Sequence, residues 1–347
     1  MKRALTLIGM LFATCLAGSI TAANATEYPL PPANSRLIGE NTTYTVPNDG
    51  RPLEAIAADY KIGLLGMLEA NPDADPYLPL PGSVLTIPTQ MLLPDTPREG
   101  IVINLAELRL YYYPKDQNKV IVYPIGIGQL GRNTPTMTTS VSQKIPNPTW
   151  TPTANIRKHY AAEGVTLPAV VPAGPENPMG LFAMRLAAGG GEYLIHGTNA
   201  NFGIGMRVSS GCIRLRPDDI EALFKAVPKG TRVQIINEPV KYSIEPDGKR
   251  YVEVHQPLSR VDSDDPQTMP IAISSSLQKF INDSQTDAQV VQEAIVRRAG
   301  MPVIVTVGET APVQAPAAVA PQSEGQQPTE QEIPKLVQPG PVYSAAN

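Results

Sequence analysis

Cys212 and His196 are the residues of this chain whose types best suit covalent chemistry. The chain holds three histidines and two cysteines, and the other cysteine, Cys15, lies in a segment with the features of a secretory signal. The mature protein would then carry one thiol, which cannot form an internal disulfide. A thiolate nucleophile needs at least a thiol and a nearby imidazole. The thiolate is the form that attacks, and a neighbouring histidine lowers the pKa of the thiol.

The neighbouring residues predict how this pair is positioned. The apolar run 193–195 predicts a strand that ends at His196, and residues 197–199 predict a turn. The small residues 209–211 predict a second turn just before Cys212, where glycine allows backbone conformations closed to other residues. A helix is expected from Pro217, because acidic residues open an apolar helical pattern there.

An alternative interpretation treats Cys212 as a small buried hydrophobe and His196 as a core residue, since free cysteine is among the most buried residue types. Three features favour the nucleophile. A spare thiol is a liability in an oxidising compartment, both residues lie beside glycine turns, and Arg214 adds a fixed positive charge near the thiol.

These residues carry a family resemblance. His196-Gly197, followed by the run Ser209-Ser210-Gly211-Cys212-Ile213-Arg214, resembles the active-site signature of the YkuD-type L,D-transpeptidases, which ends in [ST]-x-G-C-[IV]-R. The family frequently has histidine where this chain has Ser210. The resemblance covers about residues 98–238 and implies a mainly β fold with a YkuD-type β-sandwich catalytic domain.

The resemblance also implies roles for individual residues. Cys212 is the expected nucleophile, His196 the expected general base and acid, and the backbone carbonyl of Gly197 is expected to orient His196. Arg214 is expected to shape the site or bind a substrate carboxylate, and Ser209 to support the turn. Backbone N–H groups near Gly211 and Cys212 are expected to hold the oxyanion. No cofactor is implied, and the sequence shows no ligand motif that calls for a metal.

The implied reaction is acyl transfer on peptidoglycan. Cys212 would form a thioester with the meso-diaminopimelate of a tetrapeptide stem, release D-alanine and pass the acyl group to an amine. The domain arrangement resembles the Gram-negative branch that uses the C-terminal lysine of the outer-membrane (Braun) lipoprotein. A second stem, giving a 3→3 cross-link, and water are alternative acceptors. Carbapenem β-lactams are the expected covalent inhibitors, and a non-catalytic cell-wall binding protein is the alternative from a different class.

The N-terminal residues predict export to the periplasm. Residues 1–25 combine Lys2 and Arg3, an apolar run and a small-x-small site at 23–25, which is typical of a cleaved signal peptide. A lipoprotein signal with Cys15 lipidated and a retained membrane anchor are the alternatives. The formal net charge of −4 gives no support for a nucleic-acid partner.

A small module is predicted over residues 41–88. Its pattern of a strand, two short helical segments and a final strand resembles a LysM module, which implies binding to a glycan containing N-acetylglucosamine. A small packing domain without a ligand is the alternative interpretation.

The rest of the chain divides by composition. Within 98–238, strands are predicted at 100–105, 108–113, 120–125 and 233–236, and residues 142–179 predict a long irregular lid or binding loop. Residues 239–307 predict a small α+β appendage with a hairpin and one or two helices. Residues 308–347, rich in Pro, Ala and Gln, predict a disordered tail.

Overall fold

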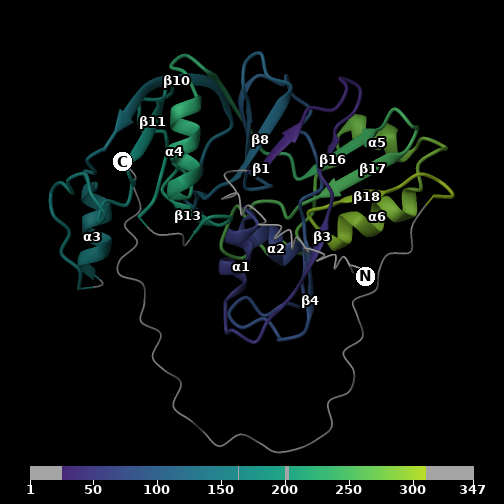
Figure 1. The fold of residues 1–347 in the computed structure, drawn as a ribbon, viewed down its shortest axis with the longest axis horizontal. Coiled ribbons are helices and arrows are strands. Elements are labelled where there is room, and N and C mark those ends of the chain that lie inside the picture. Colours follow the sequence, from purple (N-terminus) through teal and green to yellow (C-terminus); the bar gives the residue numbers. More distant parts are fainter. Residues whose placement is uncertain (1–25, 163, 200–202, 310–347) are drawn as a thin grey trace, which may run out of the picture.

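A computed structural model describes residues 26–162, 164–199 and 203–309 of the chain (Figure 1). The predicted signal peptide, 1–25, and nearly all of the predicted tail lie outside the described residues. Within the described part, no helix has the length and hydrophobicity needed to span a membrane. The elements are β1 (Thr26–Pro29), β2 (Leu37–Ile38), β3 (Thr42–Thr45), α1 (Leu53–Asp59), α2 (Leu64–Ala70), β4 (Val84–Ile87), β5 (Met91–Leu92), β6 (Gly100–Asn104), β7 (Arg109–Tyr113), β8 (Lys119–Pro124), β9 (Ile127–Gly128), β10 (Met137–Pro146), α3 (Ala154–Ala162), β11 (Phe182–Leu186), β12 (Leu194–His196), β13 (Arg207–Ser209), β14 (Ile213–Arg214), α4 (Pro217–Ala226), β15 (Arg232–Ile236), β16 (Val240–Ile244), β17 (Arg250–Val254), α5 (Ser275–Ile281), α6 (Ala288–Arg297) and β18 (Pro302–Ile304).

A nine-stranded sheet forms the centre of the molecule, in the order β1-β8-β7-β6-β15-β10-β11-β12-β14. The long strand β10 belongs to both halves, because its first residues pair with β15 and its last with β11. The register shifts between Val141 and Gln143, and such irregularities bend a strand. The two halves therefore curl around one hydrophobic core that includes Ile101, Tyr123 and Ile195. The expected β-sandwich is present as a single curled sheet.

The alternation of side chains explains why β6, β7 and β8 are buried on both faces. Residues such as Leu110 and Tyr112 face the central core, whereas Tyr111 and Tyr113 face a second cluster on the other side of the sheet. Nearly continuous apolar runs are what a strand covered on both faces requires. The four strands predicted for this region are all confirmed, as β6, β7, β8 and β15.

The sheet also takes its edge strand β1 from Thr26–Pro29, ahead of the N-terminal module, so the sheet extends beyond the predicted catalytic domain, 98–238. One prediction for this region was wrong in part, because the stretch 142–179 is less irregular than predicted. Strand β10 continues to Pro146, because its backbone pairs with β11, and α3 lies within the stretch.

The N-terminal module has the element order β3, α1, α2 and β4, with β3 and β4 pairing antiparallel. Leu53, Ile56 and Met67 of the helices pack on Leu85 and Ile87 to form its core. Figure 1 shows α1 and α2 beneath the central sheet. The identity of the N-terminal module as a LysM module stays a prediction.

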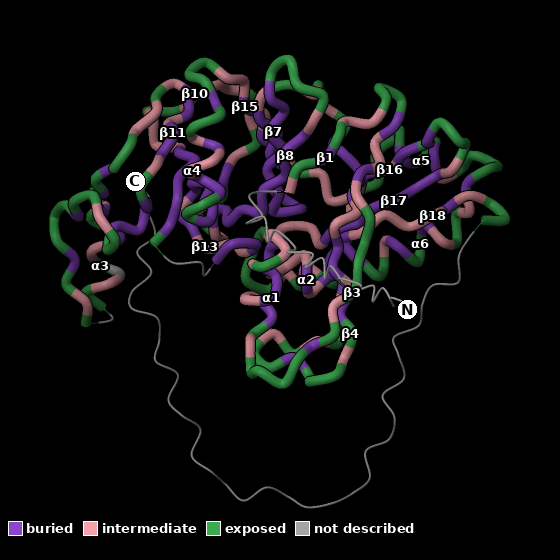
Figure 2. Tube along the Cα trace, in the orientation of Figure 1, coloured by how far each residue is buried: buried purple, intermediate pink, exposed green. Residues whose placement is uncertain are grey.

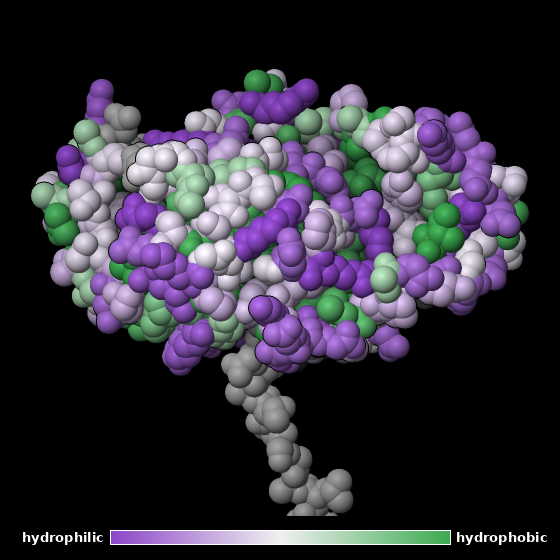
Figure 3. All heavy atoms as spheres, turned by 90° about the horizontal axis from the view of Figure 1, so that it is seen from above, coloured by the Kyte–Doolittle hydropathy of each residue, from purple (hydrophilic) through white to green (hydrophobic). Residues whose placement is uncertain are grey.

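The C-terminal region, 239–307, forms the antiparallel sheet β16-β17-β18 with α5 and α6 beside it. The predicted hairpin and both helices are present, and Ser274 and Asp287 cap the two helices with their side chains. Buried residues run through all three parts of the molecule (Figure 2). On the face seen in Figure 3, hydrophilic residues are spread over the whole surface and hydrophobic residues form small groups.

Candidate active site

His196 is the last residue of β12 and is fully buried. Its Nδ1 lies 2.6 Å from the carbonyl oxygen of Gly197, so Nδ1–H donates to Gly197 and leaves Nε2 as the acceptor. Nε2 has no hydrogen-bond partner among the described residues. Burial lowers the pKa of His196 to about 3, and the charge of Arg214 acts in the same direction. The imidazole is therefore neutral, with a free basic nitrogen.

Cys212 immediately precedes β14 and is 2% exposed. Its Sγ donates to the carbonyl of Glu192 at 3.6 Å. Burial raises the pKa of Cys212 to about 11, while a backbone hydrogen bond at Leu194 and the charge of Arg214 oppose the rise. The expectation that the site lowers the thiol pKa was wrong for this closed arrangement, because desolvation of the thiolate outweighs the nearby positive charge.

The register of β12 and β14 puts the two residues on one face of the sheet. The strands are parallel, with His196 opposite Arg214 and Ile195 opposite Ile213. Since side chains alternate along a strand, His196, Arg214 and the position of Cys212 share one face. Ile195 and Ile213 point to the other face, into the central core.

Ser209 and Gly211 form the turn before the thiol. Ser209 Oγ donates to the carbonyl of Cys212 at 2.5 Å, and the Gly211 N–H donates to Ser209 Oγ at 3.3 Å. Gly211 has a φ of 110°, which disfavours any side chain there. The predicted oxyanion donor at Gly211 is thus engaged by Ser209 in this arrangement. The buried Thr134, which sequence reasoning missed, adds a bond to the Gly211 carbonyl at 2.9 Å.

Arg214 is 1% exposed, and no nitrogen of its guanidinium has a hydrogen-bond partner among the described residues. Burial lowers the pKa of Arg214, and the charge interaction with Cys212 is the larger of the effects that raise it. A buried cation is costly unless it is paired, and the described residues leave the guanidinium of Arg214 with donors to offer.

A segment with Trp150 and α3 covers the thiol. Cys212 packs in a cluster with residues of this segment and of the sheet, namely Trp150, Ile156, Leu167, Val171, Met179, Ala183 and Leu194. Paired backbone bonds between Trp150 and Val171, at 2.9 and 2.7 Å, join the two ends of this segment to each other. The buried side chain of Asn177 also donates to the Pro148 carbonyl at 2.8 Å. Together with the sheet residues, this segment leaves Cys212 almost without exposed surface.

Comparisons with known proteins place this geometry in a family. Residues 98–235 match the L,D-transpeptidase catalytic domain, and residues 239–305 match the L,D-transpeptidase C-terminal domain. The chain is 64% identical over 292 residues to the probable L,D-transpeptidase YcfS of Escherichia coli (strain K12), covering 84% of this chain and 91% of that protein. The chain belongs to the L,D-transpeptidase family.

This L,D-transpeptidase is also 55% identical over 299 residues to the probable L,D-transpeptidase YbiS of Escherichia coli (strain K12), covering 84% of this chain and 97% of that protein. Among solved structures, it is similar to the catalytic domain of the Enterococcus faecium L,D-transpeptidase acylated by ertapenem. That similarity has a TM-score of 0.30 and 24% identity, and covers 40% of this chain and 96% of that chain.

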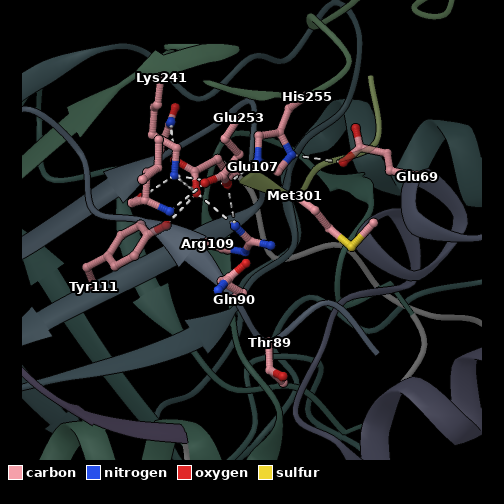
Figure 4. Close-up of polar contacts among 12 residues, drawn as sticks. Glu69, Thr89, Gln90, Glu107, Arg109, Tyr111, Lys241, Glu253, His255 and Met301 are labelled. Carbon is pink, nitrogen blue, oxygen red and sulfur yellow. Dashed lines mark hydrogen bonds and ion pairs between the residues drawn. The ribbon is translucent and has the colours of Figure 1, made fainter. Parts of the chain in front are cut away.

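Sequence reasoning missed a buried charged cluster where the three parts of this transpeptidase meet (Figure 4). Lys241 Nζ lies 3.0 Å from Glu107 and 3.1 Å from Glu253, and Arg109 Nη1 lies 3.0 Å from Glu253. His255 continues the chain of contacts to the N-terminal module. We call these residues the interdomain charge cluster; its members are Glu69, Glu107, Arg109, Tyr111, Lys241, Glu253 and His255.

Glu107, Glu253 and His255 of this cluster bring ligand atoms close enough to hold a metal ion. Lys241 and Arg109, however, already place two cations among the carboxylates. The cations and carboxylates of this cluster therefore neutralise one another as a network of ion pairs. Charged residues inside the short apolar strands β7, β16 and β17 are the sequence signal that could have revealed it.

Proposed function

We propose that this transpeptidase works through a Cys212 thioester in the periplasm. The observation that supports this most is the free Nε2 of His196, which is held as a base by Gly197 on the same face of the sheet as Cys212. A neutral thiol and a neutral imidazole are a competent pair, because the proton moves when the substrate is in place.

The proposed first half-reaction cleaves the bond between meso-diaminopimelate and D-alanine in a tetrapeptide stem. His196 Nε2 takes the proton of Cys212 Sγ, and the sulfur forms a bond to the diaminopimelate carbonyl carbon. The tetrahedral intermediate collapses as the C–N bond breaks, and His196 gives its proton to the departing amine of D-alanine. The thioester remains on Cys212.

In the second half-reaction an acceptor amine attacks the thioester carbonyl and loses a proton to His196. The C–S bond breaks, and the proton returns to Cys212. Arg214 holds a substrate carboxylate during both steps, since its buried guanidinium has donors to offer and no protein acceptor among the described residues.

The proposed acceptor is the ε-amine of the C-terminal lysine of the outer-membrane lipoprotein. The resemblance to the branch with this domain arrangement supports that choice, and the N-terminal module is proposed to bind the glycan strand as a LysM module. A 3→3 cross-link to a second stem is the alternative reaction of the same thioester.

The test incubates the purified protein with a disaccharide tetrapeptide and a peptide ending in lysine, followed by mass spectrometry beside Cys212→Ala. An adduct of stem and peptide that lacks D-alanine, absent with the variant, supports the proposal. A stem dimer or simple loss of D-alanine would change the acceptor and keep the thioester. Glycan binding without any turnover would favour a binding protein.

A carbapenem gives an independent test of the nucleophile. It presents a strained carbonyl to the thiol, so a mass increase equal to the drug is expected on the intact protein and not on Cys212→Ala. Acylation of the variant would place the nucleophile elsewhere.

A further inference from the structure

Helix α2 of the N-terminal module lacks a cap of its own. Its N-cap residue is Gly63, which provides no side-chain hydrogen bond, so the first N–H groups of the helix need other acceptors. The N–H groups of Leu64 and Leu65 donate to the carbonyls of Ile204 and Gly205, at 3.3 and 3.2 Å. Those acceptors lie between His196 and Cys212 in the sequence. The segment between the two candidate catalytic residues therefore caps a helix of the N-terminal module.

The contact is unusually close because glycines meet there. A Cβ placed on Gly63 would lie 2.7 Å from the Cα of Gly205, a separation that real Cβ atoms essentially never show. Arg216, which follows the active-site strand β14 and is buried, donates from Nη2 to the carbonyl of Ile62 at 2.8 Å. Two points of the catalytic domain thus hold the same turn of the module.

A set of hydrogen bonds connects this contact to the backbone of Cys212. Gly205 N–H donates to the Ile125 carbonyl at 2.9 Å, and β13 then pairs with β9. At the end of β13, Ser209 accepts from Gln129 N–H at 2.8 Å and donates from Oγ to the Cys212 carbonyl. The segment is therefore held by α2 at its start, by β9 between Arg207 and Ser209, and by the side chain of Ser209 at the Cys212 carbonyl.

We propose that the N-terminal module is a structural part of the active site, in which the start of α2 positions the segment that carries Cys212. The module then acts on the thiol even when no glycan is bound to it. The inference relies on the proposed function only for the chemistry that Cys212 performs, and the reactivity of the thiol can be measured without it.

Gly63→Ala tests this contact. Gly63 has a φ of −82°, which any residue adopts, so alanine alters only the approach to Gly205. Gly66→Ala is the matched control in the same helix, because its Cβ would make an ordinary contact of 3.5 Å with Ile62. Leu64→Pro is a second test, since proline suits the first position of a helix and removes the N–H that reaches Ile204.

The measurements are the rate of carbapenem acylation, the pH profile of Cys212 alkylation, thermal unfolding and sedimentation with peptidoglycan. We expect Gly63→Ala and Leu64→Pro to slow acylation by roughly tenfold or more and to shift the alkylation profile, because small displacements of reacting groups are costly. Both variants should still sediment with peptidoglycan, and Gly66→Ala should behave as the unaltered protein.

Acylation rates and pH profiles that match those of Gly66→Ala in both variants would overturn the proposal. If Gly63→Ala does not fold, Leu64→Pro decides alone, since it leaves both glycines in place. Failure of the proposed function would look different. The unaltered protein would then alkylate at Cys212 and yet leave tetrapeptide stems intact, while the comparison among variants would still apply.

Discussion

Burial changes the pKa values of Cys212 and His196 in opposite directions, and both changes favour the uncharged form. The pKa of the thiol is raised to about 11 and that of the imidazole lowered to about 3. A thiolate and imidazolium pair would place two charges in a space from which water is excluded. The closed site therefore holds both side chains in their uncharged forms.

The rate of Cys212 alkylation by iodoacetamide should therefore keep rising with pH through the neutral range and level off near pH 11. Below that pKa the thiol is protonated, and only the thiolate attacks. Mass spectrometry of the protein after timed exposure gives the rate, with Cys212→Ser as the blank. A plateau already reached at pH 7 would mean that the thiolate forms in the free protein.

Arg214→Met should raise the KM for a tetrapeptide stem by roughly a hundredfold, since hydrogen bonds to charged groups contribute about 1.5–3 kcal/mol. The same variant should unfold at a higher temperature, because it removes a buried cation for which the described part of the chain offers no hydrogen-bond partner. Steady-state kinetics and thermal unfolding measure the two effects. A stem whose free carboxylates are amidated serves as the control, and an equal effect of the variant on that stem would contradict carboxylate binding.

At the scale of elements, the sequence predicted the helices and strands that are specified by the residues within them. The strands β6, β7, β8 and β15 and the helix that starts at Pro217 follow from apolar runs and end signals. The ends of β12 and the turn at Gly211 follow in the same way. Strand β1 could not be predicted, because Thr26–Pro29 forms a strand only by pairing with Lys119–Val122.

The course of β10 and the burial of the thiol depend on long-range contacts in the same way. Proline and glycine around 142–179 suggested an irregular stretch, but pairing with β11 holds residues as far as Pro146 in the sheet. The pKa of Cys212 could not be predicted either. His196 and Arg214 suggested a lowered value, whereas the covering residues around Trp150 remove the water that a thiolate needs.

Trp150→Ala should open the segment over Cys212 and raise the alkylation rate at pH 8 by roughly tenfold. Truncating a buried tryptophan costs about 3–5 kcal/mol, here mostly local to the cluster that contains Val171 and Cys212. Trp150→Phe is the matched control, since it keeps an aromatic ring in the cluster. A rate unchanged from that of the unaltered protein would show that other contacts keep the thiol covered.

At the scale of the whole molecule, the three sequence regions form one body through the interdomain charge cluster. His255 joins Glu253 of the C-terminal region, at 2.7 Å, to Glu69 of the N-terminal module, at 2.8 Å. Glu253 in turn contacts Arg109 of the catalytic sheet. Each of these side chains is buried, so loss of one partner leaves charges uncompensated and is expected to cost about 3–5 kcal/mol.

His255 makes this assembly sensitive to alkaline pH. Its contacts with Glu69 and Glu253 outweigh the effect of burial and raise its pKa to about 9, from an ordinary value of 6.5. The folded state therefore holds this proton more tightly than the unfolded chain. The resulting stabilisation, on the order of 3 kcal/mol, is complete below about pH 6.5 and is lost as the pH rises through about 9.

The unfolding temperature should consequently fall between pH 7 and pH 10 by several degrees more in the unaltered protein than in His255→Gln. The variant cannot take up the proton, so it lacks this part of the pH dependence, although it should be less stable at pH 7. Calorimetry across that range measures both effects. Glu69→Gln should remove part of the difference, because it takes away one of the two carboxylates that hold the proton. Equal slopes for the unaltered protein and His255→Gln would show that His255 is already neutral at pH 7 and that the remaining ion pairs hold the three regions together.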